Sequence, residues 1–389
     1  MGGVSRQRGA GDPARRRASF LLVPAICGRP APAVAAVAAA VDGISRFVAL
    51  VGRFRLAEMI TRSERRRAPV FVVGCPRSGT TLLYHMLLSA GGFAYYRAET
   101  HVFNTLVRRF GNLQTVADRE RLMDKWLGSV FYRRSGLDSE NIRARVRSEC
   151  HNGGDFLRLV MGGIADRQGV SRWADCTPQH VLHMSEIKET IPEALFVHII
   201  RDGRDVALSL DKAGWVAPFP WDGGRKRLVA GLRWEWVVNT GREDGRRLGP
   251  DYLEVSFEDV VTNPREMLTQ LGLFIEHDLD YDRIQRDAVG SVKRPNTSFE
   301  GEAREGSFNP VGRWRAKYPK DELAVFEMMM GRSLEELGYE LSPGVAANSA
   351  SPGLEFMRSG YRAYFETKQW VKVNTPLSRF MADIEMLSE

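Results

Sequence analysis

One short segment of the sequence, VFVVGCPRSGTTLL at residues 70–83, constrains the fold more than any other. It begins with four apolar residues, three of them valines, a pattern typical of a strand that is buried on both faces in a parallel sheet. A glycine-bounded loop follows, and residues 80–90 then read as a helix that ends at Gly91 and Gly92. This order predicts a phosphate-binding loop, because loop N–H groups and the positive end of the helix converge on one anion.

The loop departs from the fingerprint of nucleoside triphosphatases at one position. Gly74 and Gly79 have the G-x-x-x-x-G spacing, and Thr81 stands where the magnesium-binding Ser or Thr is found. Thr80, however, takes the place of the lysine that reaches the β- and γ-phosphates. The one cation within the loop sequence is Arg77. We therefore predict that the loop holds a single terminal phosphate, without a metal ion.

Two later segments repeat the strand-to-helix pattern. Residues 194–210 contain an apolar strand followed by a helix, and a strand at Tyr252–Phe257 precedes a helix that starts after Asn263 and Pro264. Because strands alternate with helices, we predict an α/β fold with a P-loop-type central parallel sheet flanked by helices. The remaining helical patterns are predicted as insertions, at 114–133, 141–167, 225–247 and 321–337.

The sequence predicts four regions. Residues 1–68 form an N-terminal extension that is largely disordered, in which residues 33–55 could form an amphipathic helix. The folded domain covers residues 69–341, a Pro/Gly/Ser-rich linker covers 342–353, and an aromatic-rich helical extension covers 354–389. Three uses of this last extension stay open: packing against the domain, contact with a partner, and peripheral contact with a membrane surface.

Composition and charge limit the partners of this 389-residue chain. A formal net charge of +7 permits acidic ligands, but much of the excess lies in the N-terminal extension, so we do not expect the folded domain to bind nucleic acid. The apolar run at residues 31–41 is shorter than the roughly 20 residues that span a bilayer, so no transmembrane span is predicted. The four cysteines lack the paired spacing of a disulfide framework or a zinc site. We expect a cytoplasmic location, with a signal peptide and a secretory, Golgi-type location as the alternative.

A second motif, RDGRDVALS at residues 201–209, follows the strand predicted within residues 194–210. It places Arg201 at the carboxyl end of that strand and Ser209 about two helical turns further on. In open α/β sheets, ligands bind at this edge. A guanidinium and a hydroxyl there predict a site for a second phosphate of the same nucleotide.

The motifs PRSGTT, at residues 76–81, and RDGRDVALS together resemble those of the sulfotransferase family that uses 3′-phosphoadenosine 5′-phosphosulfate. The resemblance covers about residues 69–340 and implies metal-independent, in-line transfer of a sulfuryl group to a hydroxyl acceptor. It implies that the first motif binds the 5′-phosphosulfate, through Arg77, Ser78, Gly79, Thr80 and Thr81. It also implies that Arg201 and Ser209 bind the 3′-phosphate, and a looser match at residues 304–315 adds Arg313.

The segment RAETHVF at residues 97–103 is similar to tyrosylprotein sulfotransferases and their bacterial relatives. In that branch a glutamate directly before a threonine is the catalytic base, which implies this role for Glu99, with Arg77 as the catalytic cation. His101 stays the rival base, because the cytosolic branch uses a histidine. One position departs from the family: Cys176 stands where relatives often carry a lysine. Another cation would have to replace that lysine, or the protein would be slower or inactive.

Functions from other classes stay open. A nucleotide-dependent kinase would need magnesium and would bind a triphosphate, whereas a weakly catalytic nucleotide-binding or scaffolding protein would fit Cys176 and the long extensions. The sequence does not identify the acceptor: hydroxyl groups of tyrosine, carbohydrate, lipid or small molecules all fit. Association into a homodimer also stays open.

Overall fold

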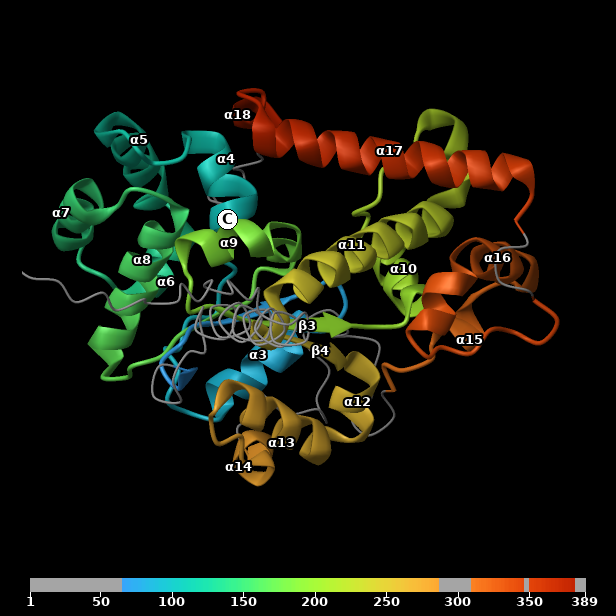
Figure 1. Ribbon diagram of the computed structural model, residues 1–389, viewed down its shortest axis with the longest axis horizontal. Helices are drawn as coiled ribbons and strands as arrows, with labels where there is room; N and C mark the ends of the chain where they lie inside the picture. The colour runs from blue at the N-terminus through green and yellow to red at the C-terminus, as the bar shows by residue number, and fades with distance from the viewer. Residues whose placement is uncertain (1–64, 287–308, 346–349, 382–389) are drawn as a thin grey trace, which may run out of the picture. The chain divides into compact units, whose positions relative to one another are not determined.

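Four strands form one parallel sheet in the computed structural model, which describes residues 65–286, 309–345 and 350–381. The strands are β1 (Val70–Val73), β2 (Ala174–Asp175), β3 (Leu195–Ile200) and β4 (Tyr252–Ser256), and they lie in the order β2-β1-β3-β4 (Figure 1). β1 and β3 pair from Val70 opposite Leu195 to Val73 opposite His198. The predicted α/β fold with a central parallel sheet is confirmed.

Most of the helices lie in the insertions between strands. Between β1 and β2 the chain forms α3 (Thr80–Ser89), the π-helical turn η1 (Val102–Leu106), α4 (Val107–Phe110), α5 (Val116–Trp126), α6 (Val130–Ser135), α7 (Ser139–Glu149) and α8 (Gly153–Gln168). Between β2 and β4 lie η2 (Pro178–His183), α9 (Met184–Thr190), α10 (Gly203–Lys212), η3 (Pro220–Arg225), α11 (Lys226–Leu248) and η4 (Gly249–Asp251). After β4 come α12 (Phe257–Thr262), α13 (Pro264–Ile275), α14 (Tyr281–Arg286), α15 (Trp314–Lys317), α16 (Lys320–Glu336), α17 (Pro352–Asn374) and α18 (Ser378–Met381).

The side chains of β1 alternate between two apolar cores. Phe71 and Val73 belong to one core, together with residues of α8 and α11. Val70 and Val72 belong to the other core, together with residues of α3 and α13. All four residues are fully buried. Because both faces of β1 are covered, its sequence shows no alternation of apolar and polar residues.

Two predicted helices are each divided in the structure. The pattern at 114–133 forms α5 and α6, because the Ser129 side chain accepts a backbone hydrogen bond of 3.2 Å and starts a new helix. The pattern at 141–167 forms α7 and α8, where the Asn152 side chain accepts a backbone hydrogen bond of 2.9 Å. The sequence does not predict β2, because two residues are too few to show a periodicity.

The helix α17 lies across α11, and α18 lies beside α4 (Figure 1). The predictions for residues 1–64, including the disordered tail and the amphipathic helix at 33–55, lie outside the described residues. The division of the rest of the chain into domain, linker and extension stays a prediction. Within the ranges that the structure describes, no helix is both long and apolar enough to cross a membrane.

Gly74 allows the start of the loop after β1 to approach β3 closely. A Cβ atom at this position would lie 2.5 Å from the carbonyl oxygen of Ile199, which is closer than such atoms approach one another. Gly74 N also donates a hydrogen bond of 3.3 Å to Pro178 O, so the loop is held from the side of β2 as well. The position of the loop against β3 therefore depends on a glycine.

We expect Gly74→Ala to lower the free energy of unfolding by about 1–3 kcal/mol, because the added methyl group would push against the backbone of a buried strand. Gly162→Ala is a matched control in α8, where an added Cβ would meet nothing within 4 Å. It should raise the free energy of unfolding by up to about 1 kcal/mol. Urea unfolding followed by circular dichroism measures both. An unchanged stability in Gly74→Ala would contradict the close approach.

Candidate active site

The loop between β1 and α3 has the backbone of an anion-binding site. Gly79 caps α3 with φ of 98°, and a Cβ there would lie 2.3 Å from the Phe257 ring, so only glycine fits. Arg77 also has a positive φ, of 77°, which is an unfavourable conformation for a residue with a side chain. The N–H groups of the first turn of α3 have no acceptor within the helix, so they can bind an anion in front of the loop.

Arg77 and Arg201, from two motifs far apart in the sequence, meet at the carboxyl edge of the sheet. Arg77 Nε donates a hydrogen bond of 2.9 Å to Ser209 Oγ, and Arg201 Nη1 donates one of 3.2 Å to the carbonyl oxygen of Arg77. The Arg77 guanidinium also lies 5.3 Å from the centre of the Trp215 ring. Burial, and then the charge of Arg201, lowers the pKa of Arg77. Two neighbouring cations that are partly removed from water favour a bound polyanion.

A late loop, residues 309–315, is fixed beside Arg201. Asp205 accepts hydrogen bonds of 2.9 Å from both Gly312 N and Trp314 N, and Arg201 Nη2 donates one of 2.5 Å to Pro310 O. Burial lowers the pKa of Arg201, although the charge of Asp205, 3.7 Å away, opposes this. The late loop thereby brings a further arginine, Arg313, near enough for its charge to lower the pKa of Arg201.

Three buried polar atoms of this region have no hydrogen-bond partner within the described residues. They are Ser78 Oγ, Gln179 Oε1 and Arg201 Nε. Gln179 and Arg201 line a cavity of about 100 Å³, together with residues of the loop between β1 and α3 and with Ser209. Buried polar atoms almost always have partners, so the two that belong to lining residues, Gln179 Oε1 and Arg201 Nε, indicate that a polar ligand completes the site. The volume suits a phosphate-sized group, and the rest of a nucleotide would extend beyond it.

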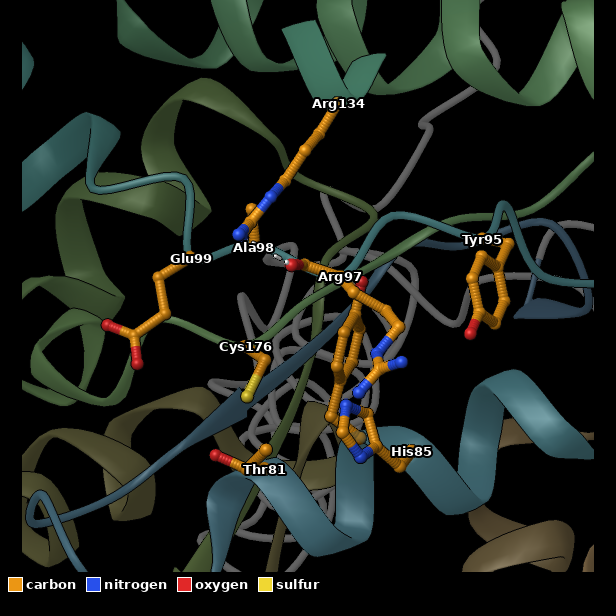
Figure 2. A pocket seen from close by; sticks show the side chains of 9 residues that line it. Thr81, His85, Tyr95, Arg97, Ala98, Glu99, Arg134 and Cys176 are labelled. Carbon is orange, nitrogen blue, oxygen red and sulfur yellow. Dashed lines mark hydrogen bonds between the residues drawn. The ribbon is translucent and has the colours of Figure 1, made fainter. Parts of the chain in front are cut away.

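Glu99 lies between this phosphate-sized cavity and a second, larger one. The second cavity has a volume of about 690 Å³ and lies over α3 (Figure 2). Glu99 and Thr81 line both cavities; the larger one is otherwise lined by Tyr84, His85, Tyr95, Arg97, Ala98, Arg134 and Cys176. Burial, followed by the charge of Asp175, raises the pKa of Glu99 to about 7. A carboxylate with this pKa can accept a proton near neutral pH.

His101 contacts Glu99 but lines neither cavity. Its Nε2 lies 3.3 Å from Glu99 Oε2, and its Nδ1 lies 3.3 Å from the side-chain nitrogen of Asn104. Burial lowers the pKa of His101 to about 4. The imidazole is therefore neutral at neutral pH. Of the two candidate bases, the structure places Glu99, and not His101, between the cavities.

Asp175, at the end of β2, holds the segment that carries Glu99. Asp175 Oδ2 accepts a hydrogen bond of 2.5 Å from Thr100 Oγ1, and Oδ1 lies 2.8 Å from His180 Nδ1. Because Phe103 N donates to His180 Nε2 at 3.3 Å, the ring proton lies on Nδ1 and is donated to Asp175. Burial alone would raise the pKa of Asp175, but His180 and the other donors outweigh it and lower the pKa. The buried carboxylate is thus ionised and fixes the chain on both sides of His101.

Comparison with known proteins decides the family. The family model described as "Sulfotransferase family" matches residues 69–282, more than half of the chain.

The chain belongs to the sulfotransferase family. The sulfotransferase is 23% identical over 278 residues to protein-tyrosine sulfotransferase A of Caenorhabditis elegans, over 70% of this chain and 67% of that protein. Among solved structures, it resembles the sulfotransferase domain of the Synechococcus PCC 7002 olefin synthase, with 21% identity, a TM-score of 0.47, and coverage of 71% of this chain and 96% of that one. A sulfotransferase from Mycobacterium avium has 15% identity and a TM-score of 0.39, with coverage of 74% and 79%. As a member of this family, the protein is an enzyme that transfers a sulfuryl group.

The structure brings most of the predicted site residues of the sulfotransferase together. One cavity is lined by Arg77, Gly79, Thr80, Thr81, Glu99, Arg201 and Ser209. Ser78 is fully buried within the loop, and Arg313 lies close to Arg201 without lining the cavity. The roles given to these residues stay predictions. In the described ranges, no three His, Cys, Asp or Glu residues are arranged to hold a metal ion.

Cys176 lies in the larger cavity, near Glu99. Burial, and then the charges of Glu99 and Asp175, raises the pKa of its thiol well above the ordinary value, so the side chain is uncharged. Cys176 therefore does not supply the cation that the lysine of relatives would supply.

Sequence reasoning does not find Asp175 or Gln179 as site residues. Both lie in the stretch ADCTPQH, in which the family resemblance singles out Cys176, at the position where relatives often carry a lysine. A usable signal is the Asp-x-Thr pattern: Thr177 N donates a hydrogen bond of 3.0 Å to Asp175 Oδ1. Such a turn is typical of an aspartate that organises a loop.

We expect the carboxyl group of Glu99 to titrate at about pH 7, well above the ordinary value of 4.5, because partial burial, and then the charge of Asp175, disfavours its ionised form. Carbon-13 NMR of protein labelled at glutamate carboxyl carbons measures this, and the signal missing in Glu99→Gln assigns it. A titration midpoint near 4.5 would contradict the environment described here.

Proposed function

We propose that the enzyme transfers a sulfuryl group from 3′-phosphoadenosine 5′-phosphosulfate to a hydroxyl acceptor, with Glu99 as the base. The observation that carries the proposal is the position of Glu99, which lines both the phosphate-sized cavity and the larger one. A base at this point can reach a hydroxyl group that enters from the larger cavity while the donor occupies the loop. Proximity of this kind supplies much of the catalysis in group transfer.

In this proposal the donor binds through both motifs. The N–H groups of the loop and Arg77 hold the 5′-phosphosulfate, while Arg201 and Ser209 hold the 3′-phosphate, with Arg313 nearby. The hydrogen bond of 2.9 Å between Arg77 and Ser209 would be exchanged for contacts of each residue with the donor. Arg201 Nε, which has no partner and belongs to a residue that lines the cavity, supports this, because a doubly phosphorylated ligand offers the acceptor and the charge that it lacks.

The proposed reaction is an in-line transfer. Glu99 accepts the proton of the acceptor hydroxyl as the acceptor oxygen forms a bond to sulfur and the bond from sulfur to the bridging phosphate oxygen breaks. Arg77 and the loop N–H groups stabilise the negative charge that develops on the bridging oxygen. The products are a sulfate ester and adenosine 3′,5′-bisphosphate, with the proton on Glu99. A Glu99 pKa of about 7 allows the carboxylate to be present and still basic near neutral pH.

The larger cavity favours an acceptor that carries negative charge beside its hydroxyl. Arg97 and Arg134 line it and supply two positive charges. Arg134 Nη1 donates a hydrogen bond of 3.1 Å to the carbonyl oxygen of Arg97, which keeps one guanidinium at the wall (Figure 2). Glu99 is the one acidic residue of the lining. The name of the Caenorhabditis elegans relative makes a tyrosine hydroxyl one candidate acceptor.

We expect Glu99→Gln to lower kcat by about 10²–10⁴-fold, because the amide cannot accept the proton. The affinity for adenosine 3′,5′-bisphosphate should not weaken, because the loop is untouched and the amide removes a negative charge from the lining of the phosphate-sized cavity. In the wild-type enzyme, kcat should rise with pH up to about 7 and then level off, since Glu99 must be unprotonated. Transfer of labelled sulfate from the donor to a panel of hydroxyl compounds measures these rates.

His101→Ala is the companion variant. A smaller loss than in Glu99→Gln agrees with a neutral, supporting imidazole. Full activity in Glu99→Gln with none in His101→Ala would make His101 the base and our assignment wrong. Bisphosphate binding by the wild type without transfer to any acceptor would instead favour the weakly catalytic nucleotide-binding protein.

A further inference from the structure

The helices α17 and α18 lie outside the residues matched by the family model, yet they contact the segments behind both walls of the candidate active site: the loop between α10 and α11 on one side, and η2 and α4 on the other. We propose that they form a strap that sets the position of the Arg77 wall relative to the Glu99 wall, with Tyr361 as its main positioning residue. This inference rests on the proposed function. It assigns the C-terminal helices a part in catalysis that their sequence, an aromatic amphipathic helix, does not reveal.

At one end, Tyr361 fixes the loop between α10 and α11. It is 2% exposed and is the buried residue of α17. Its hydroxyl accepts a hydrogen bond of 2.9 Å from Phe219 N and lies 3.1 Å from Asp222 Oδ2, to which it donates. The Tyr361 and Phe219 rings pack with their centres 4.8 Å apart. One hydroxyl therefore satisfies two groups of this loop, and the loop cannot move without losing both.

The same loop, between α10 and α11, places Trp215 against Arg77 of the loop between β1 and α3. The Trp215 ring lies 5.3 Å from the Arg77 guanidinium, within the range of a cation–π contact. Arg233 of α11 donates a hydrogen bond of 3.2 Å to the carbonyl oxygen of Trp215. The strap itself is attached to α11, because Arg358 donates hydrogen bonds of 2.7 and 3.1 Å to the buried Glu235. Tyr361, α11 and Trp215 thus form one connected support for Arg77.

At the other end, the strap reaches the wall that carries Glu99. Gln369 Nε2 lies 3.3 Å from His183 Nε2, at the end of η2. The same turn, η2, carries His180, which holds the backbone after Glu99 through Phe103 N. Beyond α17, the carbonyl oxygen of Arg379 accepts a hydrogen bond from Arg109 of α4, which directly continues η1. The strap therefore ties the segment of Glu99 to the segment of Trp215.

The reaction makes this connection important. The base and the cation act on opposite ends of the transferred group, so their separation decides whether the acceptor oxygen lies in line with the breaking bond. A misplacement of about 1 Å can cost on the order of 10²-fold in rate. A strap that holds the segments behind both walls, without lining either cavity, affects the rate of transfer more than donor binding.

The test is Tyr361→Phe in the full chain, which removes the hydroxyl and keeps the ring. We expect kcat to fall about tenfold, with the bisphosphate Kd changed less than about twofold. Tyr364→Phe is the matched control, because Tyr364 also contacts the Phe219 ring but its hydroxyl lies on the exposed side, 3.5 Å from Lys368 Nζ. Its kcat should stay within about twofold of the wild type.

A double-mutant cycle with Trp215→Ala separates positioning from loss of stability. If Tyr361 acts through Trp215, Tyr361→Phe should change kcat less than about twofold in the Trp215→Ala background. Asp222→Ala removes the acceptor of the Tyr361 hydroxyl and leaves Tyr361 intact. It should lower kcat about as much as Tyr361→Phe does, and this effect should also disappear in the Trp215→Ala background. This variant replaces Tyr361→Phe in the cycle if Tyr361→Phe folds poorly. The strap is wrong if the losses in kcat of the two single variants multiply in the double variant, or if Tyr361→Phe keeps the kcat of the wild type.

Amide hydrogen exchange tests the strap without measuring activity, so its result is independent of the proposed function. Amides of residues 213–225 should exchange faster in Tyr361→Phe than in the wild type, with no change in Tyr364→Phe. Absence of sulfuryl transfer by the wild type would refute the proposed function alone. Equal exchange in all three proteins would refute the strap alone.

Discussion

The candidate site depends on the close pairing of β1 with β3. Gly74 permits the approach, since any side chain there would collide with the carbonyl oxygen of Ile199. The two strands end side by side, and each continues into a loop that carries an arginine, Arg77 from one and Arg201 from the other. The hydrogen bond from Arg201 to the carbonyl oxygen of Arg77 is a direct result. Without this contact, the two halves of the anion site would not face one ligand.

The charges of the site follow from this arrangement. Two arginines with lowered pKa values lie together, and Asp205, the nearby carboxylate, is also engaged by the late loop. On the other side, burial, and then the charge of the ionised Asp175, raises the pKa of Glu99. Cations thus gather at the loop and a weakly acidic carboxyl group faces them. This separation suits a reaction in which a proton leaves the acceptor while negative charge develops on the donor.

The sequence predicts those parts of the fold and site that contiguous residues encode. The phosphate loop and the Arg201 motif each combine a strand, a turn and a helix within about a dozen residues, so their chemistry can be read locally. The sequence does not predict the role of Asp175, because Asp175 acts through Thr100, 75 positions away, and lies in a two-residue strand. The sequence does not predict the role of Tyr361 either, because its hydrogen-bond partners lie 139 and 142 positions away. Its aromatic helix predicts burial of one face but not which loop it holds.

A phosphate loop without the lysine should bind a 3′-phosphorylated nucleotide rather than a triphosphate. Isothermal titration of the full chain with adenosine 3′,5′-bisphosphate and with ATP, each with and without magnesium, compares the two ligands. We expect the bisphosphate to bind without magnesium and at least about tenfold more tightly than ATP. If ATP instead binds more tightly, and only with magnesium, the loop is that of a kinase.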